Sequence, residues 1–286
     1  MDRVVWTSDH PVDLAASVAR YTRWGADPVN VVVDGNYHRV TAGGTAYRAS
    51  SVSEHEIEVV VAAGNPDSAL ADLNHRLADR LPRPTSPALR NETVASGFAE
   101  MPGYRPPLVA DPFESLVTSI TAQQVNLRWA TTTRRRLVER FGTLHTIDGV
   151  SVWAFPPPAV LAGASPQELR DMQFTMRKSE YIVGVAAAAH DGHLEDLRTM
   201  STEAVLTRLT DLHGIGRWSA DWLLARCLGR GEIIAAGDLG VRKAVSWFLL
   251  GQEELASEAD VRRAVAGWGL GTNWATHLLL ERLAAT

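Results

Sequence analysis

The 286-residue sequence has a single cysteine, Cys227, and only two lysines, Lys178 and Lys243. One cysteine cannot form an intrachain disulfide, nor can it supply the several thiolates of an iron–sulfur cluster or a multi-cysteine zinc site. No apolar run is long enough to cross a membrane, and the start, Met1 to Trp6, lacks the charged-then-apolar layout of a secretory signal. These absences predict a cytosolic protein with no membrane partner.

The sequence also lacks the excess of positive charge that nucleic-acid-binding proteins usually carry, since its formal net charge is -5. The deficit is uneven along the chain. Residues 1–100 carry 13 acidic against 9 basic side chains, whereas residues 101–286 carry 20 against 19. The larger C-terminal part can therefore still present a local basic face, and the net charge does not rule out DNA binding.

The N-terminal part has the pattern of a small α/β domain. Short strands are expected at residues 29–33, 37–41, 46–48 and 57–62, with hairpin turns at Asp34-Gly35 and Gly43-Gly44. Helices are expected at 11–21 and 68–81. The proline-rich run 81–87 cannot continue a helix and predicts a linker.

From about residue 89 onward the strand patterns nearly vanish and helical spacing recurs. The expected helices are 112–120, 126–141, 157–162, 165–172, 178–191, 202–212, 217–228, 240–249, 258–268 and 274–283, most of them separated by Pro, Gly or capping residues. The fold class predicted from these patterns is therefore α+β, with an antiparallel sheet and two helices followed by an all-helical region.

The segment Leu212-His213-Gly214-Ile215-Gly216 joins two of these helices through a tight turn. Two glycines around one aliphatic residue let the backbone take left-handed dihedrals and approach another molecule closely, while the isoleucine is expected to point inward. The amides that open the next helix would then face outward as an anion site suited to a DNA phosphate. A monovalent cation at the backbone near Leu212 and Gly214 is a further candidate. Taken alone, the motif fits a plain helix–helix turn equally well.

Aromatic and acidic residues follow this turn at informative positions. Trp218 and Trp222 stand four residues apart on one face of the next predicted helix, and Asp238 stands directly before the helix after that. An aspartate there usually acts as an N-cap. The helix dipole also favours its negative charge, which is the state needed to stabilise a developing cation.

The run Leu-His-Gly-Ile-Gly-Arg-Trp-Ser-Ala at 212–220, followed by Gly-Asp-Leu-Gly-Val-Arg at 237–242, resembles the signature of the helix-hairpin-helix DNA glycosylase superfamily. Within it, the sequence looks most like the DNA-3-methyladenine glycosylase II (AlkA-type) family. Residues 104–125 of this sequence resemble the segment before that family's first core helices, and residues 155–178 resemble its next helical block. The resemblance implies an N-terminal α+β accessory domain over 1–88 and a two-lobed helical core with a cleft between the lobes. One lobe would span 113–232, and the other would combine 89–112 with 233–286.

The resemblance further implies a monofunctional glycosylase that hydrolyses the N-glycosidic bond of alkylated bases, chiefly 3-methyladenine and 7-methylguanine, in duplex DNA as the first step of base excision repair. Relatives that also cleave the strand carry a nucleophilic lysine where this sequence has Trp218, and neither Lys178 nor Lys243 stands there. Asp238 would stabilise the positive charge on the deoxyribose and orient or deprotonate water. No cofactor is implied, and a monomer acting on nucleoid DNA in the cytoplasm is expected.

The damaged base must leave the stack before it reacts, and a cationic purine stacks well on indoles. The resemblance places Trp218 and Trp222 in the base pocket, and Trp274 on the last helix is expected to join them. The relatives carry a pocket tryptophan where this sequence has Leu280. A changed pocket is therefore expected, and the lesion range cannot be carried over.

The gap left in the duplex would be filled from the segment Gln123-Gln124-Val125, with either Gln124 or Val125 as the intercalating residue. For Gln123, capping or bridging of buried backbone is an equally good interpretation. The resemblance thus implies a set of DNA-binding residues that comprises Gly214, Ile215, Gly216, Arg217, Gln123, Gln124 and Val125.

Other functions stay open at this point. The protein could be a glycosylase for deaminated or oxidised bases, or a non-catalytic protein that binds damaged DNA through the hairpin. The basic run 134–136, with Arg128 and Arg140 nearby, fits either phosphate contact or a solvated helix face. His190 and His193 have no third ligand at a recognisable spacing, so no metal site is expected.

Overall fold

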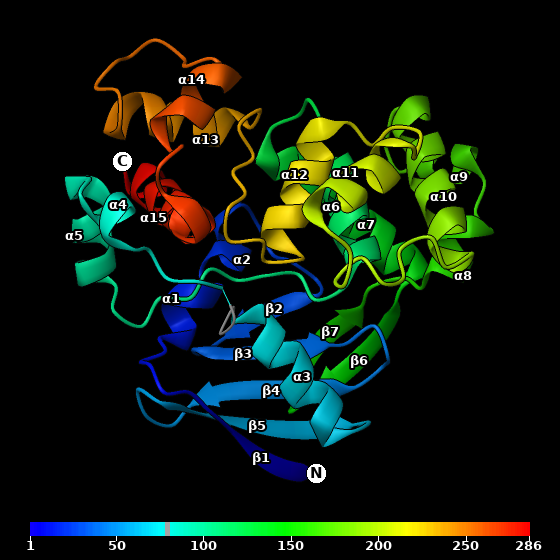
Figure 1. Ribbon diagram of the computed structural model, residues 1–286. Helices are drawn as coiled ribbons and strands as arrows, with labels where there is room; N and C mark the ends of the chain where they lie inside the picture. The colour runs from blue at the N-terminus through cyan, green and yellow to red at the C-terminus, as the bar shows by residue number, and fades with distance from the viewer. Residues whose placement is uncertain (78–80) are drawn as a thin grey trace. The chain divides into compact units, whose positions relative to one another are not determined.

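The computed structural model describes residues 1–77 and 81–286. The chain divides into two compact units, each assembled from separate stretches of sequence (Figure 1). Unit 1 takes in the described parts of Met1–Asp79, Gly103–Asp196 and Leu212–Gly214, and unit 2 those of Arg80–Pro102, Leu197–Asp211 and Ile215–Thr286. The domain boundaries at 88, 112 and 232 inferred from the sequence do not coincide with this division and stay a prediction.

Unit 1 is built on a five-stranded antiparallel sheet in the order β1-β5-β4-β3-β2 (Figure 1). The strands are β1 (Asp2–Thr7), β2 (Asn30–Val33), β3 (Asn36–Val40), β4 (Ala46–Ser51) and β5 (Glu56–Ala63). Four of them were predicted, and the turn Asp34-Gly35 has the left-handed φ values, 49° and 75°, of a tight hairpin. β1 was missed because Val4, Val5 and Trp6 form a short continuous apolar run, in which the exposed Val5 hides the alternation of the inward-facing Val4 and Trp6.

The core of this sheet lies between one of its faces and the helices α1 and α3. It includes Leu14, Tyr37, Ile57 and Leu73.

The two helices predicted in this part of the chain are present in altered form. The helix expected over 11–21 is broken at Ala19 into two short helices. The helix expected over 68–81 corresponds to α3, and positions 78–80 of that prediction lie outside the described residues. The helices are α1 (Leu14–Val18), α2 (Arg20–Arg23) and α3 (Pro66–Arg76).

The opposite face packs on a second, two-stranded sheet formed by β6 (Thr143–Ile147) and β7 (Val150–Ala154). Its turn, Asp148-Gly149, has left-handed φ values of 50° and 82°, and Asp-Gly is among the dipeptides that most favour such a hairpin. This hairpin corrects the expectation of an unbroken helical region after residue 89. The Asp-Gly pair was the signal that could have revealed it.

The remainder of unit 1 is helical and centres on α6 and α10. α6 packs on α7 and α10, and α10 packs also on α8 and α9 (Figure 1). Four of these helices begin with a side chain that accepts an amide of the first turn, namely Asp111, Asn126, Ser165 and Thr175. The helices are α6 (Pro112–Ala122), α7 (Leu127–Phe141), α8 (Pro158–Ala162), α9 (Pro166–Asp171) and α10 (Met176–His190).

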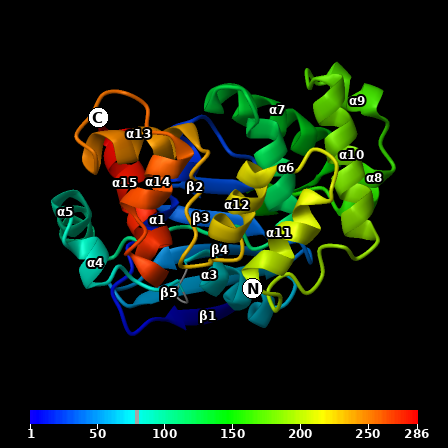
Figure 2. The same cartoon turned by 45° about the horizontal axis from the view of Figure 1, so that its top comes forward.

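The regular elements of unit 2 are all helices among the described residues. α15, buried from 272 to 279, packs on α5 and α13, and Figure 2 shows α11 beside α12 and α13 beside α14 and α15. α4 begins at Ser86, inside the expected linker, because a proline is accepted in the first turn of a helix. The helices are α4 (Ser86–Leu89), α5 (Glu92–Glu100), α11 (Thr202–Thr210), α12 (Arg217–Arg226), α13 (Leu239–Phe248), α14 (Glu258–Ala264), the short 3₁₀ helix Gly269–Gly271 and α15 (Thr272–Ala285).

The predicted α+β fold class is confirmed: a sheet with helices in the N-terminal part is followed by helices in the rest of the chain. Among the described residues, no helix combines the length and apolar character needed to cross a membrane.

Candidate active site

The turn between α11 and α12 has the compact geometry expected from its sequence. Gly214 has a left-handed φ of 87°, and the Ile215 side chain is 4% exposed, which confirms that it points inward. Gly216 is the N-cap of α12 and has no side chain with which to cap the helix. The first amides of α12 therefore lack a capping side chain and can bind an anion.

The two glycines of the turn have different roles. A Cβ on Gly214 would lie 2.1 Å from Cγ of Tyr181, so no side chain fits there. Gly216 is extended, with φ -91°, and a Cβ on it would meet no atom within 4 Å. The expectation of left-handed dihedrals therefore holds for Gly214 but not for Gly216, because an N-cap residue takes the extended conformation. The open space beside Gly216 lets another molecule approach the backbone closely.

Asp238 is the N-cap of α13, where its Oδ1 accepts the Val241 amide at 3.0 Å. Its Oδ2 accepts the indole N–H groups of Trp218 and Trp222, each at 3.2 Å. The structure thus brings the predicted carboxylate and two of the predicted pocket tryptophans into one half-buried cluster. The N-cap interpretation of Asp238 also holds, since one oxygen caps the helix while the other meets the indoles.

Local sequence explains how this cluster forms. Trp218 and Trp222 are one helical turn apart, so their ring edges reach the same oxygen atom. The positive end of the α13 dipole favours a carboxylate at its N-cap. A carboxylate offers about four lone-pair sites, and the three donors leave one of them for a water molecule or for charge that develops nearby.

Two further side chains limit the space around this cluster. A Cβ on Gly240 would lie 3.1 Å from Oδ1 of Asp238 and 3.4 Å from Cδ2 of Leu280, which places Leu280 close to the carboxylate. The guanidinium of Arg226 lies 4.4 Å from the ring centroid of Trp222. Arg226 therefore covers one face of Trp222.

Trp274 does not have the environment expected of it. Its side chain is 2% exposed, and the guanidinium of Arg83 lies 5.2 Å from its ring. α15 is the buried helix of unit 2, so this ring has no open face on which a flipped base could stack. This burial speaks against the expected place of Trp274 in the base pocket, which stays a prediction.

The segment proposed for intercalation follows α6. The side-chain amide of Gln123 donates to the Gly214 carbonyl at 3.1 Å, which favours the backbone-bridging interpretation of Gln123. Gln124 is exposed and has a left-handed φ of 54°, unusual for a residue with a side chain, whereas Val125 is half-buried. The Gly214 carbonyl retains a second lone pair, and the monovalent cation near Leu212 stays a prediction.

Neither lysine is among the donors to Asp238 that the described residues supply. Lys178 donates from Nζ to the Thr121 carbonyl at 3.0 Å, at the end of α6, and burial lowers its pKa. Lys243 is exposed on α13. Among the described residues, the donors to Asp238 are one backbone amide and two indoles.

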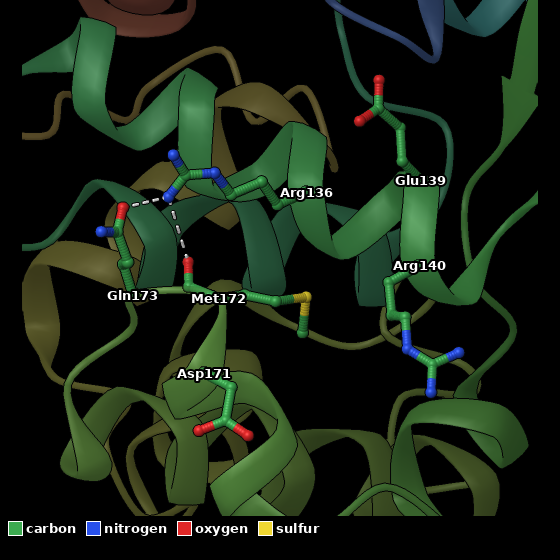
Figure 3. A pocket seen from close by; sticks show the side chains of 6 residues that line it. All are labelled: Arg136, Glu139, Arg140, Asp171, Met172 and Gln173. Atoms are coloured by element: carbon green, nitrogen blue, oxygen red, sulfur yellow. Dashed lines mark hydrogen bonds between the residues drawn. The ribbon is translucent and has the colours of Figure 1, made fainter.

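The basic run on α7 is mostly paired within unit 1. Arg134 binds Asp27 and Arg135 binds Glu139, both at 2.6 Å. Arg136 donates to the side chain of Gln173 and, at 3.5 Å, to the Met172 carbonyl. Figure 3 shows the hollow of about 550 Å³ in which it lies, lined by Arg136, Glu139, Arg140, Asp171, Met172 and Gln173. This pairing favours a structural role for the run over phosphate contact.

Comparison with known proteins identifies the family of this chain. The chain matches the model of the HhH-GPD superfamily base excision DNA repair protein over residues 117–270, more than half of its length. The chain belongs to this superfamily, and the resemblance inferred from the hairpin and aspartate motifs is confirmed.

Individual relatives are named as glycosylases. The chain is 30% identical over 173 residues to a DNA-3-methyladenine glycosylase of Bacillus subtilis, which covers 60% of this chain but only 57% of the relative. It is 25% identical over 258 residues to DNA-3-methyladenine glycosylase 2 of Escherichia coli, covering 88% of this chain and 86% of the relative. The structure of a 3-methyladenine DNA glycosylase from Archaeoglobus fulgidus matches with a TM-score of 0.84 at 26% identity, covering 98% of this chain and 97% of the other.

Proposed function

We propose that this protein is a monofunctional DNA glycosylase that hydrolyses the N-glycosidic bond of alkylated bases in duplex DNA, with Asp238 as its catalytic carboxylate. The observation that carries the proposal is the meeting of two indole N–H groups on one oxygen of Asp238. It joins an aromatic surface to a fixed negative charge. The relatives named for 3-methyladenine support the alkylated class of substrate.

Asp238 would act chiefly through its charge. Cleavage of the N-glycosidic bond leaves positive charge on the deoxyribose, and a carboxylate held in advance by three donors stabilises that charge without reorganising. Its remaining lone pair can orient the attacking water and accept its proton. An alkylated base is already cationic and leaves readily, so no second acid is required.

The flipped base would stack on Trp218 and on the face of Trp222 opposite Arg226. Indole rings are electron-rich and attract a cationic purine more strongly than a neutral one. Selection of alkylated bases would thus come from the charge of the base. Leu280, beside the carboxylate, would add an apolar wall where the relatives have a further aromatic ring.

We infer that Gln124, rather than Val125, enters the gap left by the base. Its side chain is exposed and its backbone is held in a strained conformation, whereas Val125 is half-buried. The bond from Gln123 to the Gly214 carbonyl would fix the position of this segment relative to the hairpin turn. The uncapped amides of α12 would bind the DNA backbone.

The absence of strand cleavage belongs to the same proposal. A lyase reaction needs an amine that attacks the sugar and forms a Schiff base. Trp218 stands where the lyases of the superfamily have their lysine, and it donates to Asp238 through an indole N–H that cannot act as a nucleophile. The product would therefore be an intact strand with an abasic site.

Duplexes that carry one lesion each test the proposal. They would contain 7-methylguanine, 3-methyladenine, hypoxanthine or 8-oxoguanine, with chromatography of free bases and gel analysis of strands before and after alkali. Release of the methylated bases, with breaks only after alkali, is expected. Release of hypoxanthine or 8-oxoguanine alone would contradict the alkylated class, breaks without alkali would contradict the monofunctional reaction, and no release from any duplex would favour a DNA-binding protein.

A further inference from the structure

One buried carboxylate on α12 holds two arginines. Asp221 is 1% exposed; its Oδ1 accepts Nε of Arg217 at 2.8 Å and its Oδ2 accepts Nη2 of Arg262 at 3.0 Å. Arg217 is the first residue of α12, and Arg262 lies on α14. The three side chains together carry one excess positive charge.

The carboxylate is buried, but the arginines are open to solvent. Arg217 is 54% exposed and Arg262 is 39% exposed. Each uses one N–H on Asp221, and a guanidinium has five. A single arginine would neutralise Asp221, and two cations held side by side repel each other. An anion bound between them on the solvent side relieves that repulsion.

The position of the pair indicates which anion. Arg217 directly follows Gly216, so the pair adjoins the first turn of α12, whose amides lack a capping side chain and favour negative charge. Guanidinium groups bind phosphate oxygens in a planar, two-bonded arrangement. The matching ligand is a phosphodiester of the DNA backbone.

We propose that Arg217 and Arg262, held side by side by Asp221, form a two-arginine site for one backbone phosphate of duplex DNA. Asp221 is the positioning residue of this site. The inference rests on the proposed function, since it takes DNA as the ligand. The hairpin motif led to the expectation that Arg217 contacts DNA. The sequence motifs did not indicate a role for Arg262 or Asp221.

Equilibrium binding to an undamaged duplex at two salt concentrations tests the site. Arg262→Gln removes the α14 cation and leaves the Arg217–Asp221 pair. Arg263→Gln is the matched control, because Arg263 is the next residue of α14, is 75% exposed and pairs with Asp260 at 2.8 Å. Both variants lose one positive charge from the same helix, so only a specific phosphate contact separates them.

The salt dependence gives the expected size of the effect. Loss of one phosphate contact lowers the slope of log K against log salt by about 0.9. The ratio of the wild-type binding constant to that of Arg262→Gln should therefore fall about threefold between about 50 and about 200 mM salt. Arg263→Gln should keep the wild-type slope. Arg262→Lys keeps the charge and the slope but binds more weakly than wild type, because it loses the planar geometry.

A purely structural link between α12 and α14 predicts something else. Arg262→Gln would then lower the melting temperature but keep the wild-type salt slope, and this result would overturn the inference even if the wild type releases bases. A wild type that shows the arginine-dependent slope but releases no base would overturn the proposed function and leave the phosphate site standing. A wild type that binds no duplex at low salt would overturn both.

Discussion

Alanine at Gly214 should destabilise the protein far more than alanine at Gly216, two residues later in the same turn. At Gly214 the backbone has φ 87°, and a new Cβ would lie 2.1 Å from Cγ of Tyr181 and 2.4 Å from Cδ1 and Cδ2. The left-handed conformation costs a residue with a side chain about 1–2 kcal/mol, and displacing a packed ring costs about 1–3 kcal/mol. The free energy of unfolding should fall by about 2–5 kcal/mol.

At Gly216 the same methyl group meets no atom within 4 Å, and φ is -91°. Alanine is a poorer N-cap than glycine, by about 0.5–1 kcal/mol, but it removes a similar amount of unfolded-chain entropy. Stability should therefore change by less than about 1 kcal/mol. Under the proposed function, a phosphate would reach the α12 amides through the space that this methyl group enters, so Gly216→Ala should bind duplex DNA more weakly.

Urea unfolding and duplex binding of both variants separate these effects. The double variant Gly214→Ala, Tyr181→Ala removes the overlap, and its stability loss should be smaller than the sum of the two single losses. Equal stability of the two glycine variants would refute the steric reasoning. Wild-type DNA affinity in Gly216→Ala would refute the assignment of Gly216 to close approach.

Three further changes have predictable results. Trp222→Phe keeps an aromatic ring but removes one of the donors that orient Asp238. Single-turnover base release should therefore slow about tenfold, equivalent to about 1.4 kcal/mol, and an unchanged rate would speak against an orienting role of the Trp222 indole. Glu114→Gln leaves the buried Arg39 without its counter-charge, and urea unfolding should show a loss of about 3–5 kcal/mol, whereas wild-type stability would show the pair to be dispensable. Burial, reinforced by the nearby Glu114, raises the pKa of Asp111, so its ionised form costs folded-state stability at higher pH. Asp111→Asn, which can keep the helix cap, should therefore stabilise the protein at pH 7 and give no gain well below about pH 3.9; an equal gain at both pH values would contradict the assignment.

The parts of the site that could be predicted from the sequence are those whose geometry is local. The Gly214 turn and the shared face of Trp218 and Trp222 depend only on residues within one or two helical turns, as does the N-cap role of Asp238. The bonds from both indoles to Asp238 depend on the packing of α12 on the start of α13, which periodicity does not reveal.

Other features could not be predicted for the same reason. Trp274 is a tryptophan like Trp218 and Trp222, and its burial follows from the packing of α15, which the sequence does not show. The bond between Asp221 and Arg262 joins residues 41 positions apart. Strands β6 and β7 are short and partly exposed, so apolar and polar residues alternate only weakly along them. The Asp148-Gly149 turn was the clear sequence sign of this hairpin.

The identity of Asp238 as the catalytic carboxylate is tested most directly by single-turnover base release from methylated duplex by Asp238→Asn. Asparagine is as good an N-cap as aspartate. Its one oxygen can keep the cap to Val241, while its amide nitrogen replaces the oxygen that the indoles meet. The variant should therefore fold and bind duplex as the wild type does. Base release should slow by about 10²–10⁴-fold. The same change at Asp13, the N-cap of α1, should have no effect on release. Release by Asp238→Asn at the wild-type rate would contradict the account.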